Sequence, residues 1–344
     1  MRKYFSSLLL ILFFSLTSFS QVDKDSLLQE FFNKDSIKIL VTDSGLGGLS
    51  IAADLFEKLK TTGIFKKVDI VFFNAQPHLE SGYNSLKTRE HKVWVFENAL
   101  EAMEANFHPD MILIGCNTLS VLYESTKFSK NAVIPVYGIV DAGVNLIEEN
   151  INKDSEVIIF ATKTTVSEGK HKSSLIKDGF AEDKIITIPC PRLAGAIERG
   201  FESRKTDSLV NVYVQQSIDE LKKTNTNDNI FVSYNCTHYG YVDNLFRKTF
   251  KKYGVEVNNF LDPNIYMTEF FFTKNHLNKY KSTEISIAVY SQAELTDGKL
   301  NSINTLIKKT SPQAAQALLN YTFDPFYFEW TKDDMEAELQ SQKQ

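Results

Sequence analysis

Short apolar runs alternate with amphipathic stretches along most of the chain. The runs have the length and the bounding residues of buried strands, and they cover residues 37–42, 69–73, 111–114, 133–139, 156–161, 184–188, 229–233, 255–261 and 285–290. Between runs, apolar residues recur every three or four positions, as at Val93, Phe96, Leu100 and Met103, which predicts helices with one buried face. Strands that alternate with helices predict parallel sheets covered by helices on both faces.

Reactive or polar side chains follow several of these strands. Cys116 comes just after 111–114, and Cys236 comes after 229–233 in a similar arrangement 120 residues later (236 − 116). Asp43 and residues 162–165 end two other strands. Because ligands collect at the carboxyl ends of parallel strands, the sequence predicts one cleft lined by all of these residues.

A glycine cluster, Asp-Ser-Gly-Leu-Gly-Gly at residues 43–48, lies between the first strand and a helical pattern at 51–59. Glycines allow a tight turn, and the start of a helix presents free amide groups, so this turn is suited to binding a carboxylate. Its spacing differs from a dinucleotide fingerprint, and it lacks the Lys-Ser/Thr ending of a phosphate loop. A plain structural turn is the alternative.

The first twenty residues have the pattern of a signal peptide. Arg2 and Lys3 precede an apolar run at 8–14, and Ser18 and Ser20 occupy the positions that a signal peptidase inspects. The run is shorter than the ~20 residues that span a bilayer. We expect cleavage after Ser20, a polar and loosely held leader at 21–35, and a mature chain that is secreted or periplasmic and not held in a membrane.

The composition of the chain restricts the classes of partner and of site that are expected. The formal net charge is −5, and no Lys/Arg stripe provides a footprint for nucleic acid, so a small molecule is the expected partner. Three cysteines are too few for a disulfide framework. Cys190, between two prolines, is interpreted as a packed, inert thiol. Because it follows a different strand, it is expected to lie out of reach of the other two cysteines. The cysteines and six histidines lack zinc-site spacings, so no metal is expected.

Three segments together, residues 43–48, 116–118 and 236–239, resemble the signature motifs of the aspartate/glutamate racemase family, and those of its glutamate-specific branch most closely. The resemblance covers roughly residues 36–290. It implies two pseudo-symmetric α/β lobes, with one cysteine from each facing the substrate, and no cofactor. The first lobe is expected at 36–138 plus about 258–310, the second at 139–257, and a tail of unknown role at 311–344. No chemistry is expected in the segment from about residue 296 to residue 344.

The same resemblance implies roles for individual residues. It assigns catalysis to Cys116, Cys236, Asp43 and His238. It assigns substrate contacts to Ser44, Tyr83, Asn84, Asn117, Thr118, Thr165 and Thr237. Two loops depart from the family pattern: Tyr83-Asn84 follows Gly82 in place of Pro-Tyr-Gly, and Lys163-Thr164 replaces Pro-Gly.

The expected reaction is interconversion of L- and D-glutamate, or aspartate, by two bases on opposite faces of Cα. A thiolate can remove the proton while the opposite thiol supplies one. Three alternatives stay open: a buried structural role for the cysteines, a same-fold isomerase or decarboxylase of another small dicarboxylic acid, and a secreted binding protein without catalysis. A homodimer is also left open.

Overall fold

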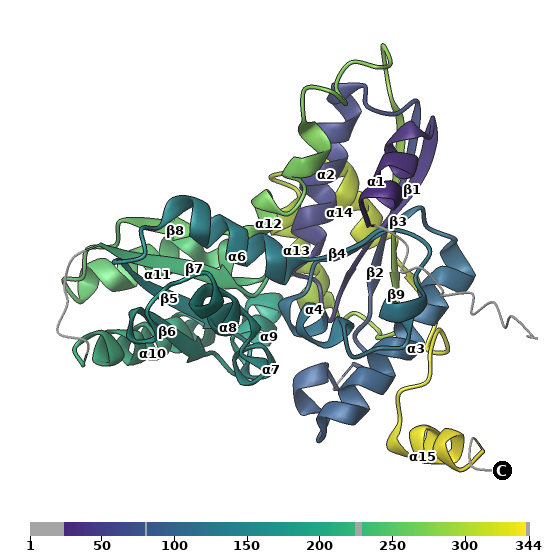
Figure 1. Cartoon of the computed structure of the whole chain (residues 1–344). Coiled ribbons are helices and arrows are strands. Elements are labelled where there is room, and N and C mark those ends of the chain that lie inside the picture. Colours follow the sequence, from purple (N-terminus) through teal and green to yellow (C-terminus); the bar gives the residue numbers. More distant parts are fainter. Residues whose placement is uncertain (1–23, 80, 224–228, 342–344) are drawn as a thin grey trace, which may run out of the picture.

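The computed structural model describes residues 24–79, 81–223 and 229–341 (Figure 1). The predicted signal peptide lies outside these residues. Two separate parallel sheets are each flanked by helices, which confirms the predicted fold class. Within the described ranges, no helix is both long enough and apolar enough to cross a membrane.

The first sheet has six strands in the order β10-β9-β2-β1-β3-β4, all paired in parallel. They are β1 (Ser36–Asp43), β2 (Lys67–Asn74), β3 (Met111–Ile114), β4 (Val136–Gly138), β9 (Glu284–Ser291) and β10 (Thr322–Phe323). The second sheet has four parallel strands in the order β6-β5-β7-β8. They are β5 (Glu156–Ala161), β6 (Ile185–Pro189), β7 (Ile230–Asn235) and β8 (Asn259–Leu261).

Helices cover both sheets. Around the first sheet lie α1 (Lys24–Asn33), α2 (Leu49–Thr62), α3 (Arg89–Phe107), α4 (Asn117–Tyr123), α5 (Phe128–Asn131), α13 (Asp297–Ile307), α14 (Pro312–Leu319) and α15 (Lys332–Ser341). Around the second lie α6 (Ile139–Asn150), α7 (Lys163–Glu168), α8 (Lys170–Lys177), α9 (Leu193–Arg199), α10 (Arg204–Leu221) and α11 (Asp243–Lys252). The short helix α12 (Pro263–Tyr266) follows β8, and single 3₁₀ turns cover Tyr83–Ser85, Glu182–Lys184, Tyr239–Val242 and Glu269–Phe272.

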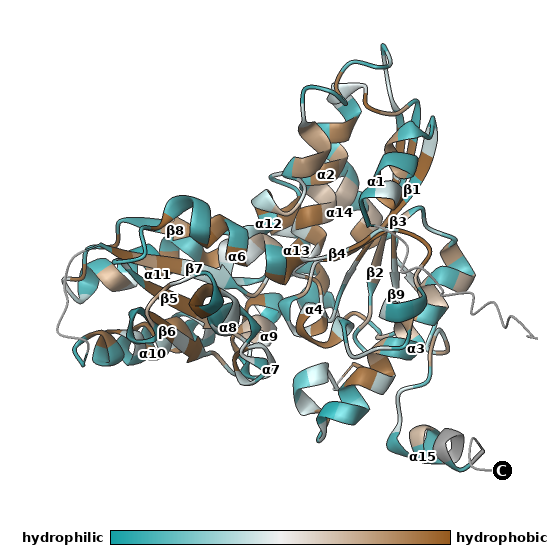
Figure 2. Cartoon of the chain, viewed as in Figure 1, coloured by the Kyte–Doolittle hydropathy of each residue, from teal (hydrophilic) through white to brown (hydrophobic). Residues whose placement is uncertain are grey.

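The central strands of each sheet, such as β1 and β5, are buried on both faces, as the apolar runs predict. In β1, Ile39 and Val41 face one hydrophobic cluster and Leu40 faces another, because successive side chains alternate across a strand. The second sheet has its own two clusters. Figure 2 shows the same arrangement, with hydrophobic strands inside and hydrophilic residues on the outer helices.

Two strand predictions are too long. Of residues 133–139, only Val136–Gly138 form a strand, and α6 begins at Ile139. Of residues 255–261, only β8 is a strand, and it pairs with β7 in the second sheet. The chain therefore returns to the first lobe after β8, slightly later than the expected residue 258.

Both ends of the described chain differ from expectation. The described part of the leader, residues 24–35, is packed against the first lobe, because α1 buries Phe31 and Phe32 against Phe65 and Phe271. The tail is part of the first lobe: α14 contributes to the core, β10 extends the sheet, and Phe328 is buried. Polar residues around these aromatic side chains conceal the amphipathic pattern in the sequence.

Candidate active site

A cavity of about 410 Å³ lies where the carboxyl ends of strands from both sheets meet. Asp43 ends β1, Cys116 begins the turn from β3 into α4, and Cys236 follows β7. All three line the cavity, together with Ser44, Tyr83, Asn84, Asn117, Thr118, Thr237 and His238. The structure therefore brings all but one of the predicted site residues to a single cavity between the lobes.

On the first-lobe side, Cys116 lies beside Ser44 and Asp43. The Cys116 Sγ is 3.1 Å from Ser44 Oγ. Burial raises the pKa of the Cys116 thiol well above its usual range, and the charge of Asp43 raises it further. Burial also raises the pKa of Asp43, against the opposing charge of His238. The carboxylate of Asp43 is therefore placed to accept a proton from Cys116.

On the second-lobe side, Cys236 lies beside a buried chain of charged groups. His238 Nδ1 is 3.7 Å from Cys236 Sγ, and His238 Nε2 is 2.8 Å from Glu198 Oε1. Burial lowers the pKa of His238, but its bonds to Cys236 and Glu198 outweigh that effect and raise the pKa well above the usual value. A protonated imidazole therefore lies beside the Cys236 sulfur.

Two lining residues present polar atoms that have no partner among the described residues. The hydroxyl of Tyr83 and both amide atoms of Asn117 are buried and without a hydrogen bond. A buried polar group without a partner is unfavourable by roughly 1–3 kcal/mol. Since both side chains line the cavity, a polar ligand there would satisfy them.

The two loops that depart from the family pattern contact each other across the lobes. Asn84 Oδ1 accepts hydrogen bonds from Thr164 N at 3.1 Å and from Thr164 Oγ1 at 2.9 Å. Thr118 Oγ1 and Thr162 Oγ1, 2.8 Å apart, form a second bridge. Thr165, predicted to contact the substrate, does not line the cavity: its Oγ1 lies 3.0 Å from Oγ1 of Thr162, which does line it.

Several residues that line the cavity are not among those predicted from the sequence. The buried pair Glu198 and Lys299 contributes charge to the wall, and Arg192 and Arg199 lie exposed at its edge. Glu198 is in an amphipathic helix and Lys299 is far along the chain, within the segment expected to carry no chemistry. A charged residue among the apolar positions of a helix, as Glu198 is in Leu-Ala-Gly-Ala-Ile-Glu, was the available signal.

Cys190 is closer to the site than expected. It lines the same cavity, although it was predicted to lie out of reach of the other cysteines. Its thiol donates to Ile188 O at 3.4 Å, and burial raises its pKa well above the usual value. The thiol is therefore held protonated, in keeping with an inert role. The described structure contains no disulfide.

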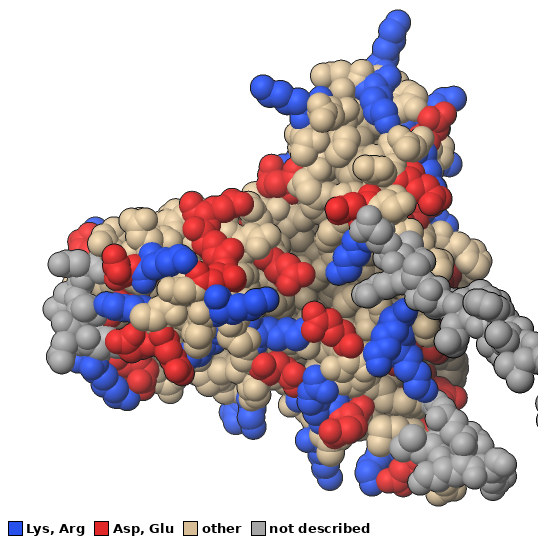
Figure 3. Space-filling view, in the orientation of Figure 1, with Lys and Arg blue, Asp and Glu red and all other residues tan. Residues whose placement is uncertain are grey.

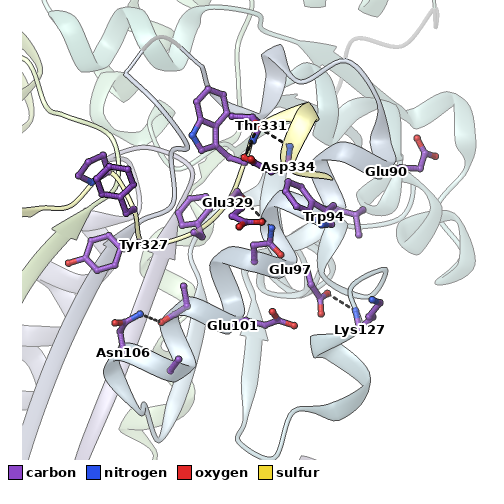
Figure 4. Close-up of a pocket in the computed structure, with 18 of the residues that line it drawn as sticks. Glu90, Trp94, Glu97, Glu101, Asn106, Lys127, Tyr327, Glu329, Thr331 and Asp334 are labelled. Atoms are coloured by element: carbon purple, nitrogen blue, oxygen red, sulfur yellow. Dashed lines mark hydrogen bonds between the residues drawn. The ribbon is translucent and has the colours of Figure 1, made fainter. Parts of the chain in front are cut away.

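A larger hollow of about 1330 Å³ lies between α3 and residues 325–334 (Figure 4). Its polar groups are already engaged, as where Glu97 accepts from the backbone amides of Lys127 and Phe128. None of the unpartnered buried side-chain atoms in the described residues lines it. The smaller cavity is therefore the better candidate for chemistry.

Neither a metal site nor a charge stripe stands out elsewhere. Across the part of the chain that the structure describes, no group of three or more His, Cys, Asp or Glu side chains is arranged to hold a metal ion. On the face in Figure 3, acidic and basic side chains are interspersed over both lobes.

Comparisons with known proteins agree with the motifs, although no family model matches the chain. The glutamate racemase of Campylobacter jejuni is 28% identical over 218 residues, which are 62% of this chain and 78% of that protein. The fold matches the crystal structure of a glutamate racemase from Bacillus anthracis with a TM-score of 0.61 and 18% identity, covering 85% of this chain and 97% of that one. It also matches the crystal structure of the glutamate racemase from Francisella tularensis in complex with D-glutamate, with a TM-score of 0.57 and 21% identity, covering 80% of this chain and 94% of that one. The chain is thus similar to glutamate racemases in sequence and in fold.

Proposed function

We propose that the protein is a cofactor-independent racemase that interconverts the L and D forms of glutamate or aspartate. One observation carries the proposal: two cysteines from opposite lobes line one cavity, and each has its own ionisable neighbour, Asp43 for Cys116 and His238 for Cys236. Inversion at Cα requires an acid and a base on opposite faces of the carbon, and this arrangement supplies both.

The reaction balances with protein groups alone. The thiolate of one cysteine takes the Cα proton, and the electron pair delocalises into the α-carboxylate. The thiol of the other cysteine then gives a proton to the opposite face, which regenerates a thiol and a thiolate with exchanged roles. Donors aimed at the carboxylate, for which the amide of Asn117 is available, would stabilise the charge that develops there.

Two related activities fit less well. A decarboxylase of a small dicarboxylic acid needs no second acid on the far face, whereas this cavity has a complete pair on both sides. A binding protein without catalysis does not require Glu198 to hold the histidine beside Cys236. Glutamate-racemising relatives favour glutamate as the first substrate to test.

The direct test is a panel of single-enantiomer amino acids followed by circular dichroism, with and without chelator and without added pyridoxal phosphate. We expect the signal of L-glutamate or L-aspartate to decay to zero, with Cα deuterium incorporated in heavy water. An unchanged signal and no deuterium for the whole panel would contradict a racemase. Loss of activity in chelator would contradict the cofactor-independent mechanism.

We also propose that the protein acts outside the cytosol, where it would convert amino acids released from cell-wall turnover. Support comes from the charged, apolar and small-residue segments at positions 2–20. Amino-terminal sequencing of the mature protein should begin at Gln21. A sequence that begins at Met1 or Arg2 would contradict this location.

A further inference from the structure

Lys299 enters the cavity from a helix that the catalytic motifs do not include. Its side chain is 7% exposed, and its Nζ lies 2.8 Å from Glu198 Oε2 and 3.0 Å from Gln76 Oε1. Gln76 belongs to the loop after β2 in the first lobe, and Glu198 belongs to α9 in the second. Lys299 therefore joins the two lobes at the cavity wall.

The backbone around Lys299 is fixed by packing between lobes. One turn later on α13, Ser302 Oγ donates to Ile197 O at 2.9 Å and accepts from Phe201 N at 3.3 Å. Lys299 and Ser302 thus project from the same face of α13 toward α9. This anchoring holds the ammonium group in place beside Glu198.

Glu198 is shared between Lys299 and the histidine beside Cys236. Its Oε2 faces Lys299, while its Oε1 accepts from Leu46 N and faces His238 Nε2, each at 2.8 Å. Burial acts to raise the pKa of Glu198, but the charge of Lys299 and the bonds and charge of His238 lower it well below its ordinary value. The carboxylate stays ionised within the cavity wall.

The charge of Lys299 affects how readily His238 can exchange a proton with Cys236. A buried carboxylate with only a histidine beside it would hold a proton firmly on that histidine, because the ion pair has no other neutralising partner. With Lys299 in place, the carboxylate is already balanced. His238 and Cys236 can then exchange a proton as a pair without leaving an uncompensated charge on Glu198. Charged or titratable groups that act on or pack against His238 are Asp43, Glu198, Cys236 and Tyr241, with Lys299 on the far side of Glu198.

We propose that Lys299 is a positioning residue for proton transfer on the Cys236 side: it balances Glu198, which orients His238 beside the thiol. The inference builds on the proposed racemase function. It assigns Lys299 to one face of the substrate only, because its hydrogen bonds to described residues go to Glu198 and Gln76 and none goes to Ser44 or Cys116.

The test uses the full chain with Lys299→Met and glutamate deuterated at Cα in each enantiomer. The equilibrium constant of racemisation is one, so kcat/KM must be equal in both directions for every variant. Isotope effects, in contrast, report which proton transfer is slow. We expect kcat to fall roughly 10- to 100-fold, part of the 10²–10⁴ that acid–base catalysis supplies. We also expect the isotope effect on the enantiomer deprotonated by Cys236 to increase relative to the isotope effect on the other enantiomer.

Two further variants test whether the effect survives without an unpaired buried carboxylate and whether it is specific to Lys299. Glu198→Gln with Lys299→Met removes both charges, so it leaves no unpaired buried carboxylate and folds even if the single variant does not; we expect the same shifted ratio. Lys58→Met is the matched control, since Lys58 also pairs with two carboxylates, Asp54 at 2.9 Å and Glu269 at 2.8 Å, but outside the cavity. Its kcat and isotope ratio should match those of the unaltered chain.

The outcomes separate the two proposals. If the unaltered chain racemises glutamate and folded Lys299 variants keep its isotope ratio, then Lys299 has no one-sided role and the inference is overturned alone. If the unaltered chain exchanges no Cα proton of glutamate or aspartate, the proposed function fails and the inference fails with it.

Discussion

Thr237 Oγ1 donates a hydrogen bond of 2.7 Å to Asp43 Oδ2, so the residue after one cavity cysteine contacts the carboxylate beside the other. The same oxygen accepts from Gly48 N at 2.5 Å. Both bonds favour the ionised form of Asp43 and oppose the effect of burial on its pKa. The two half-sites are therefore linked directly, in addition to sharing a cavity.

Thr237→Val should therefore weaken the Cys116 side although Thr237 follows Cys236. A hydrogen bond to a charged group contributes a free energy of about 1.5–3 kcal/mol. If this contribution is lost in the transition state, kcat/KM should fall about 10- to 100-fold. Steady-state kinetics measures this. Thr249→Val is the control, because the Thr249 hydroxyl donates to Leu245 O within α11, away from the cavity. Equal losses in both variants would show a general effect on stability.

The two cavity cysteines should act on opposite enantiomers. Cys116→Ala and Cys236→Ala should each abolish racemisation, whereas Cys190→Ala should keep it. With serine at either position, Cα deuterium exchange from the two pure enantiomers should become unequal, and the family resemblance implies that Cys116 acts on the D form and Cys236 on the L form. Equal exchange in both serine variants would contradict this division.

The Asn84–Thr164 contact should set substrate affinity. Asn84→Ala removes two hydrogen bonds between the lobes, each worth about 0.5–1.5 kcal/mol, so we expect KM to rise several-fold with a smaller change in kcat. Asn150→Ala is a suitable control, since Asn150 bonds only within α6. A KM unchanged by Asn84→Ala would remove this loop from substrate recognition.

The carboxyl-terminal aromatic cluster should contribute to stability. Phe328 is 7% exposed, whereas Phe326, two residues earlier, is 88% exposed. In urea denaturation, Phe328→Ala should lower the free energy of unfolding by about 3–5 kcal/mol. Phe326→Ala should change it by no more than about 0.5 kcal/mol. Similar small losses would mean that residues 321–330 are not part of the first-lobe core.

His171 should make the protein less stable in mild acid. Burial lowers its pKa from 6.5 to about 4, so between these values the unfolded chain binds a proton that the folded chain does not. Stability should fall as the pH falls through this window, by about 3 kcal/mol in total, with no effect above 6.5. His171→Gln should flatten that slope in urea titrations at several pH values. An equal dependence of stability on pH in both proteins would contradict this role of His171.

Local pattern was enough to predict most strands and the position of both cavity cysteines. Apolar runs ending in Asp43, Cys116 and Cys236 correctly indicated carboxyl ends, because parallel strands place those ends at one edge. Lys299 could not be predicted, since its role depends on α13 packing against α9 about 100 residues away in sequence. Thr162 could not be preferred to Thr165 as the lining residue, because sequence does not tell which hydroxyl of a Thr-rich turn faces the cavity.

The order of strands along the chain has a consequence for folding. All pairings of the second sheet fall within residues 156–261, whereas β2 of the first sheet pairs with β9, more than 200 residues later. Closing long loops is slow, so the central sheet of the first lobe can be completed only after the whole second lobe has been synthesised. A nascent chain would thus carry one folded half of the cleft, with Cys236 in place, before β9 and β10 complete the edge of the sheet that carries Cys116.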